Sequence, residues 1–345
     1  MFASVRRHLL IVASSTILTL VLAEGVVLRG VLRYNGLSDL AIYERDIELG
    51  WTIVPNARGW HAALDFGLWL RSDEHGFRSP VDDGPAPPVP EGAQQILVLG
   101  DSFAFGWGVA ADRMFSTELE RQLSPRGRPY AVRTAAVPGY STDQEYLQWR
   151  RLSTHVHPDR VVLLFHQSDP PGNIREWSDM GKFSYGKPRF DIANGRLALV
   201  NVPVPDKRLL APDSALEPAK KLLRPLAMYA VLQSAMRNGI HLPAPRVAAQ
   251  PVPVLDPAAY TVTAALLEAL DADIRAHGAT LFVALIPTEP VMTARLAEIC
   301  HTLGIAFLDL QPAFANQTDV LLVHDGHWNA KGHAIAARAV APFVR

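Results

Sequence analysis

The 345-residue chain has a single cysteine, Cys300, and almost no net charge, with 33 lysines and arginines against 34 aspartates and glutamates. A lone cysteine excludes an intramolecular disulfide and a cysteine-ligated zinc site. The balanced charge provides no excess of basic residues for a phosphate backbone, so nucleic acid is not an expected partner. With 49% apolar and 19% charged residues, the composition is typical of a globular protein and excludes a disordered chain.

The sequence also lacks the usual signatures of nucleotide binding and of several hydrolase classes. No GxxxxGK[ST] loop, GxSxG elbow or HExxH motif occurs. Gly106, Gly108 and Ala111 imitate the spacing of a dinucleotide fingerprint. They come six residues after a predicted strand rather than in its first turn, and no acidic residue ends the second strand. We therefore expect no cofactor.

A histidine-based metal site is the other alternative that the sequence raises. His324, His327 and His333 lie close together in the chain. Asn329 is a good N-cap for a helix that would begin next to it, and this helix would direct His333 away from the other two side chains. We therefore expect no metal, and we place His324 and His333 in the wall of a site or on the surface.

One long apolar run is present near the N-terminus. Leu9–Leu28 contains only one charged residue, Glu24, and follows Arg6 and Arg7. About 20 apolar residues are needed to span a bilayer, and basic residues favour the cytoplasmic side. We interpret residues 1–33 as an uncleaved, single-pass anchor in the cell inner membrane, with the rest of the chain on the extracytoplasmic, periplasmic side. A cleaved export signal and a buried core helix are the alternatives.

Two proline-rich stretches divide the rest of the chain. The first, Ser79–Gly92, and the second, Pro243–Pro257, each contain five prolines. Such stretches are typical of linkers and of the edges of insertions. We predict an extracytoplasmic stem and linker at 34–93, followed by a main domain at 94–345 that carries an insertion at 170–256.

The main domain alternates short apolar runs with helical periodicity, which indicates a parallel sheet covered by helices on both faces. We predict a three-layer α/β/α fold with a doubly wound, flavodoxin-like sheet of five parallel strands. Ligands of such sheets bind at the carboxyl ends of the strands. The predicted strands are Gln95–Gly100, Ala131–Val137, Arg160–His166, Thr280–Ile286 and Ile305–Leu310, and the predicted helices are Phe115–Leu123, Pro257–His277, Thr293–Leu303 and Ala330–Ala341.

Three residues at this edge of the sheet have side chains suited to acyl transfer. Ser102 directly follows the first strand, whereas Asp325 and His327 lie between the last strand and the last helix. The fold would bring them together, with His327 taking the serine proton and Asp325 holding the imidazole. The alternative is that Ser102 is only a turn or helix-capping residue.

These motifs resemble the SGNH hydrolases, also called GDSL esterases or lipases. The resemblance rests on Gly100-Asp101-Ser102-Phe103, on a glycine after the second strand, and on the Asp-Gly-His-Trp-Asn element at 325–329. It covers about residues 95–345 without the insertion. Further residues resemble membrane-anchored bacterial members of that family: Glu24 with Arg29, Gly50-Trp51, Pro55-Asn56 and Gly76-Phe77-Arg78.

The resemblance implies a role for each matching residue. Ser102 would be the nucleophile and would also offer its N–H to the oxyanion. Gly139 would be the second oxyanion donor, His327 the base and Asp325 its orienter. Asp101 would support the loop rather than react.

The chain departs from the family pattern at two positions. Ser168 stands where an asparagine side chain is expected as the third oxyanion donor, and Gln167 is the other candidate for that role. The acid commonly precedes the histidine by three residues, but Asp325 precedes His327 by two, and His324 occupies the third position.

The insertion leaves the sheet at its carboxyl edge, directly after Asp169, and should cover the site. Within it, Glu217–Arg237 has the pattern of an amphipathic helix, which Pro225 should kink or split. It would either pack on the main domain or form a lid or a membrane contact.

Together these features predict a membrane-anchored serine esterase that forms an acyl-Ser102 intermediate. The resemblance favours an O-acetyl group on a cell-envelope carbohydrate as substrate. Two alternatives remain: an O-acyltransferase that uses the same residues on a polysaccharide, and a catalytically impaired carbohydrate-binding protein. The expected partners are an acylated small molecule or carbohydrate and the membrane. The sequence does not indicate any particular protein partner.

Overall fold

The computed structural model describes residues 2–31, 42–63, 65–124, 127–180, 183–210, 223, 226–229, 232 and 256–345. At its centre is a sheet of five strands in the order β14-β13-β7-β5-β6, with every neighbouring pair parallel. This confirms the predicted five-strand parallel sheet and its flavodoxin-like strand order. The strands are β5 Gln94–Gly100, β6 Tyr130–Thr134, β7 Arg160–Phe165, β13 Thr280–Leu285 and β14 Ala306–Asp309.

The central strands are apolar on both faces because both faces are covered. In β5, Ile96 and Val98 pack into one hydrophobic cluster, whereas Leu97 and Leu99 pack into another. All four side chains are almost completely buried. Successive side chains of a strand point to opposite faces, so the two clusters are the two sides of one sheet.

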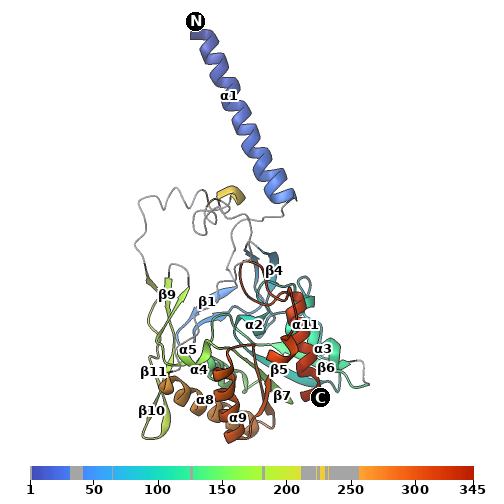
Figure 1. Cartoon of the computed structure of the whole chain (residues 1–345), viewed down its shortest axis with the longest axis vertical. Coiled ribbons are helices and arrows are strands. Elements are labelled where there is room, and N and C mark those ends of the chain that lie inside the picture. The colour runs from blue at the N-terminus through green and yellow to red at the C-terminus, as the bar shows by residue number, and fades with distance from the viewer. Residues whose placement is uncertain are drawn as a thin grey trace.

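Helices form the outer layers (Figure 1). Helices α3 (Phe115–Leu123) and α11 (Ala330–Val340) pack together on one face. Helices α4 (Thr142–Leu152), α8 (Pro257–Ala276) and α9 (Pro290–Leu303) bury apolar side chains on the other. The structure therefore has the three layers predicted for it. Three short helices lie at strand ends: α2 (Ser102–Phe105), α5 (Asp169–Asn173) and α10 (Gln311–Phe314).

Small antiparallel elements lie outside the central sheet, and the sequence patterns did not predict them. Before β5 come two hairpins, β1 (Tyr43–Asp46) with β2 (Gly50–Ile53) and β3 (Arg58–Ala62) with β4 (Gly67–Arg71). After α5 come β8 (Trp177–Met180), β9 (Phe183–Gly186), β10 (Arg189–Ala193), β11 (Arg196–Val200) and β12 (Arg208–Leu209). Most of the helix predicted at Glu217–Arg237 lies outside the described residues.

The segment before β5 packs against the loops that follow β5 and β6. The indole Nε1 of Trp51 donates to the Pro138 carbonyl at 3.0 Å, and the Tyr140 hydroxyl donates to the Trp51 carbonyl at 2.5 Å. Arg78 is 2% exposed, and its guanidinium donates to the carbonyls of Phe105, Gly106 and Val109. These contacts fix the backbone at the carboxyl edge of the sheet.

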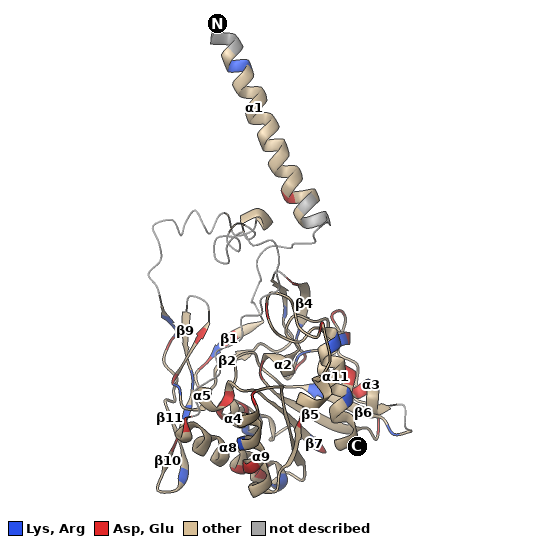
Figure 2. Ribbon diagram, viewed as in Figure 1, with Lys and Arg blue, Asp and Glu red and all other residues tan. Residues whose placement is uncertain are grey.

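The N-terminal helix extends away from this body (Figure 1). It comprises α1 (Phe2–Leu22) and a π-helical segment at Ala23–Val31. Val5–Val26 is long and apolar enough to cross a membrane, and none of its most apolar window is buried. Figure 2 shows charged residues only near the two ends of this helix. One of them, Glu24, accepts hydrogen bonds from the amides of Ala227 and Met228 at 2.7 and 2.9 Å.

Candidate active site

Ser102 is positioned by a sharp turn at the carboxyl end of β5. It is the first residue of α2, and Asp101 is the N-cap of that helix, accepting the Phe103 amide at 2.8 Å. The first N–H groups of a helix have no acceptor within the helix, so the N–H of Ser102 is available to a ligand. The Oδ1 atom of Asp101 is thus occupied in holding the turn.

Ser102, His327 and Asp325 form one hydrogen-bonded chain, which we call the trio. The Ser102 Oγ lies 2.7 Å from the His327 Nε2. On the other side of the ring, the His327 Nδ1 is hydrogen-bonded to the Asp325 Oδ1. A carboxylate can only accept, so this contact places the proton on Nδ1 and leaves Nε2 free to accept from the Ser102 hydroxyl.

A tight turn explains how an acid two residues before the histidine reaches it. Gly326 has φ +85°, a left-handed conformation that glycine adopts without strain. The Leu322 amide donates to the His327 carbonyl at 2.7 Å, and the Gly326 amide donates to the Leu322 carbonyl at 3.2 Å. The chain therefore turns back on itself between the two residues, and Asp325 faces the ring of His327.

The second oxygen of Asp325 is held by Trp107, whose Nε1 donates to Oδ2 at 3.1 Å. Burial acts to raise the pKa of Asp325, but the hydrogen bonds from His327 and Trp107 outweigh it and lower that pKa. Asp325 is therefore ionised at neutral pH. The ring of Trp107 packs at 4.1 Å, centre to centre, against His61 of β3. Burial, with Arg78 and His327 nearby, lowers the pKa of His61 to about 4, so this histidine is neutral.

Gly139 and Ser168, the predicted oxyanion donors, lie in loops at the same edge of the sheet. Gly139 has φ +82°, which positions its N–H as few other residues could. That N–H makes no hydrogen bond to any described residue. The loop is held beside the end of β5, because the Val137 amide donates to the Gly100 carbonyl at 3.1 Å.

The hydroxyl of Ser168 is paired with a neighbouring histidine. Ser168 Oγ lies 2.7 Å from the Nδ1 of His166, and the same nitrogen lies 3.4 Å from the Oδ2 of Asp101. Burial lowers the pKa of His166. Its ring packs on Phe103, 5.1 Å between centres, and Phe103 also packs on His327 at 4.8 Å.

The structure separates the histidines of the metal-site alternative. His324 contacts Asp65, with its Nδ1 2.6 Å from the Asp65 Oδ1. His333 is buried with its ring edge-on to Trp328, and burial lowers its pKa to about 3. Among the described residues, no group of three or more His, Cys, Asp or Glu side chains could hold a metal ion.

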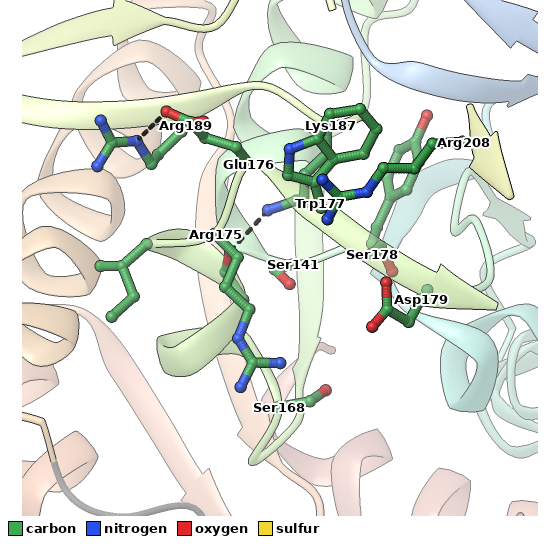
Figure 3. A pocket seen from close by; sticks show the side chains of 14 residues that line it. Ser141, Ser168, Arg175, Glu176, Trp177, Ser178, Asp179, Lys187, Arg189 and Arg208 are labelled. Atoms are coloured by element: carbon green, nitrogen blue, oxygen red, sulfur yellow. Dashed lines mark hydrogen bonds and ion pairs between the residues drawn. The ribbon is translucent and has the colours of Figure 1, made fainter. Parts of the chain in front are cut away.

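A cavity of about 780 Å³ opens beside Gly139 and Ser168 (Figure 3). Its walls come from α5, from strands β8, β10 and β12 and from the loop after β6. Four cationic and two acidic residues line it, and we call it the arginine cavity. The lining residues are Gly139, Tyr140, Ser141, Ser168, Gly172, Ile174, Arg175, Glu176, Trp177, Ser178, Asp179, Lys187, Arg189 and Arg208.

Behind this wall lies a group of completely buried acids. The Nζ of Lys187 contacts the Asp143 Oδ2 at 2.5 Å and the Gly172 carbonyl at 2.8 Å. Neither oxygen of Glu145 has a hydrogen-bond partner among the described residues. Burial, together with the nearby Asp169 and Asp101, raises the pKa of Glu145 well above its usual value. Burial therefore favours the neutral form of the Glu145 carboxyl group.

Several residues of the site were not predicted from the sequence. In the sequence, Trp107 is only part of a glycine-rich stretch, and nothing there indicates that its partly buried indole N–H finds an acceptor in Asp325. His166 was not expected to contact Ser168. Asp65 and the arginines of the cavity carry no local sequence signal, because their positions depend on short hairpins.

Comparisons with known proteins gave structural similarities only. No family model matches the sequence, and no curated protein matches it. A solved structure of TesA has 13% identity and a TM-score of 0.43, covering 73% of this chain and 98% of its own. An acetyl xylan esterase, AlAXEase, has 11% identity and a TM-score of 0.39, covering 73% of this chain and 100% of its own. AlinE4, an esterase of the SGNH-hydrolase family, has 11% identity and a TM-score of 0.37, covering 73% of this chain and 95% of its own. The roles of the site residues therefore rest on this chain's own geometry.

Proposed function

We propose that the protein is a serine esterase of the SGNH type. The observation that carries this proposal is the trio, in which a serine, a histidine and an ionised aspartate are hydrogen-bonded in series. Ser102 Oγ attacks the ester carbonyl while its proton passes to the His327 Nε2. The tetrahedral intermediate then expels the alcohol, which takes that proton. Water, activated by the same histidine, releases the acid from the acyl-Ser102 intermediate.

The oxyanion is stabilised by the N–H groups of Ser102 and Gly139 and by the Ser168 hydroxyl. Asp101 next to His166 Nδ1 supports the third donor, because a carboxylate favours the tautomer with the proton on that nitrogen. In this tautomer His166 donates to Ser168 Oγ, and the hydroxyl hydrogen of Ser168 is free for the substrate. Donors held in place before the reaction stabilise the developing charge most effectively.

The substrate that we favour is an O-acetyl ester on a cell-envelope carbohydrate. A short acyl group is supported by the crowding beside Gly139, where an added Cβ would lie 2.7 Å from the Met180 Cε and 3.4 Å from the Trp51 ring. A large alcohol moiety is supported by the polar arginine cavity, which is wide enough for sugar rings. The apolar N-terminal helix supports a single-pass anchor that holds the enzyme at the periplasmic face of the inner membrane.

The test uses the full chain in detergent micelles and a small neutral acetate ester, with Ser102→Ala as the control. Hydrolysis by the wild type and none by the variant is expected. Turnover that occurs only after an oligosaccharide acceptor is added would assign the acyltransferase reaction instead. Equal turnover by wild type and Ser102→Ala would overturn both.

A further inference from the structure

Two arginines of the arginine cavity are left without a polar partner in the described part of the chain. The guanidinium groups of Arg175 and Arg208 make no hydrogen bond or ion pair with any described residue. The other two cations of the wall are compensated: Lys187 contacts the buried Asp143 at 2.5 Å, and Arg189 lies 3.5 Å from Glu176 and 3.0 Å from Asp191.

The acidic residues of the wall do not cancel these two free charges. Glu176 faces Arg189, and Asp179 accepts the Ser184 hydroxyl at 2.6 Å. Apart from the paired Lys187, Arg189 and Glu176, the charged residues of the wall are two arginines and one aspartate. The cavity is therefore net positive, although the whole chain carries a net charge of -1.

The two free arginines lie at different places along the cavity wall. Figure 3 shows the Arg175 side chain extending toward Ser168, whereas Arg208 lies beside Trp177. The Arg208 guanidinium stacks over that indole ring, 4.1 Å from its centre. Stacking holds the planar group in one orientation and leaves its N–H donors at the rim free for a ligand.

We propose that the arginine cavity binds an anionic carbohydrate chain through its oxyanionic groups, with Arg175 and Arg208 each recognising one. This rests on the proposed function, and it assigns the alcohol side of the ester to an acidic rather than a neutral polysaccharide. Arg175 lies toward Ser168 and would hold the anionic group nearer the ester, and Arg208 would hold one further along the chain. The planar guanidinium fork matches carboxylate and phosphate groups, so acidic and phosphorylated sugars share this chemistry.

The experiment measures binding to the full-length Ser102→Ala protein in detergent micelles, so that no turnover interferes. The ligands are an oligogalacturonate, its fully methyl-esterified neutral form, and a mannose-6-phosphate oligosaccharide. We expect the oligogalacturonate to bind at least about tenfold more tightly than its neutral form, and the difference to shrink as salt screens the charges.

Substitutions then locate the binding site. Arg175→Gln and Arg208→Gln, added singly, should each weaken binding about tenfold. Arg196→Gln is the matched control, because this exposed arginine of the neighbouring strand β11 does not line the cavity. Unchanged thermal unfolding midpoints would show that each variant is folded. Arg175→Lys keeps the charge but lacks the planar guanidinium group, so its affinity for the oligogalacturonate should lie between those of the wild type and Arg175→Gln.

Each outcome bears on the proposal. Equal affinity for the charged and neutral ligands, or wild-type affinity in folded Arg175→Gln and Arg208→Gln, would overturn it. Binding of the phosphorylated ligand alone, with the same dependence on arginine, would support it and identify phosphate as the anion. Arginine-dependent binding by a protein that hydrolyses no ester would refute the proposed function but not the cavity's specificity. Ester hydrolysis without arginine-dependent binding would refute the specificity proposed for the cavity but not the proposed function.

Discussion

The trio and the arginine cavity lie at the same edge of the sheet but are supported in different ways. Ser102 and His327 lie at the ends of elements that belong to the three-layer body, next to β5 and α11. The cavity wall instead comes largely from α5 and the short antiparallel strands β8, β10 and β12. The packing of a parallel sheet fixes the first arrangement, whereas the second depends on surface segments that vary easily. We infer that the trio sets the reaction and the cavity sets the substrate.

Replacing the base should reduce turnover more than any other substitution of a trio or cavity residue except the nucleophile itself. In His327→Ala, Ser102 loses the acceptor of its proton, and we expect kcat to fall by about 10⁴-fold or more for every ester tested. Steady-state kinetics with a small neutral acetate and with an acetylated polysaccharide would measure this. A loss confined to the polysaccharide would contradict the division between trio and cavity.

Replacing the acid, Asp325, should cause the next largest fall in kcat. Asp325→Asn keeps the shape of the side chain but removes the carboxylate that holds the proton on the His327 Nδ1, so kcat should fall by about 10³ to 10⁴. Because the pKa of Asp325 is lowered, the carboxylate stays ionised down to acidic pH, and wild-type activity should show no loss from Asp325 protonation above its usual value of 3.8. A pH–rate profile would test this.

Ser168, the proposed third oxyanion donor, lies where the two regions meet. Ser168→Ala should lower kcat about tenfold to a hundredfold with little change in KM, because the hydroxyl is needed only when negative charge develops. Gln167→Ala is the control, since the Gln167 side chain accepts from Thr288 at 2.9 Å and is not among the residues lining the cavity. If Gln167→Ala lowers kcat and Ser168→Ala leaves it unchanged, Gln167 rather than Ser168 is the third oxyanion donor.

Replacing Trp107, which donates a hydrogen bond to Asp325 of the trio, should cause a smaller fall in kcat. Trp107→Phe keeps an aromatic ring against His61 but removes the N–H that holds the Asp325 Oδ2. We expect kcat to fall about tenfold, since one hydrogen bond to a charged group contributes about 1.5–3 kcal/mol. The variant should leave the affinity of the Ser102→Ala background for anionic ligands unchanged. A change in that affinity would show that the two regions are coupled.

The buried carboxyl behind the cavity should affect stability rather than turnover. Because the folded pKa of Glu145 is raised above 4.5, the folded state retains a proton that the unfolded state releases. Stability is therefore lost as pH rises from 4.5 through the folded pKa, by up to about 1.4 kcal/mol per pH unit. Glu145→Gln removes this dependence, so the unfolding free energy of the variant should rise relative to that of the wild type as pH increases from 4.5 toward the folded pKa of Glu145. A constant difference would show that Glu145 is ionised in the folded protein.

How well the fold could be predicted depended on which side chains each element buries. Strands β5, β7 and β13 were predicted to within one residue because they are short apolar runs, buried on both faces. Helix α4 was not predicted, because it buries Thr142, Asp143, Gln144, Glu145 and Gln148 and has no clear apolar period. The antiparallel strands after α5, such as β8 and β11, are short and only partly buried, so their alternation of apolar and polar residues is too weak to recognise.

The residues of the site also differ in how well the sequence predicts them. Ser102, Asp325 and His327 could be proposed from the sequence because Ser102 closely follows a recognisable strand and the other two lie in a short motif before a recognisable helix. The contact of Trp107 with Asp325 joins residues 218 positions apart and has no local signal. Arg175 and Arg208 could not be assigned to one cavity, because the strands that position them were not predicted.

The central claim, that Ser102 is the nucleophile activated by His327, is tested most directly by covalent modification. The full chain is treated briefly with a fluorophosphonate, and the modified peptide is identified by mass spectrometry. We predict one phosphonyl group on the peptide that contains Ser102, none in Ser102→Ala, and strongly slowed labelling in His327→Ala. Labelling of Ser168 or another residue at the wild-type rate in Ser102→Ala would contradict the account.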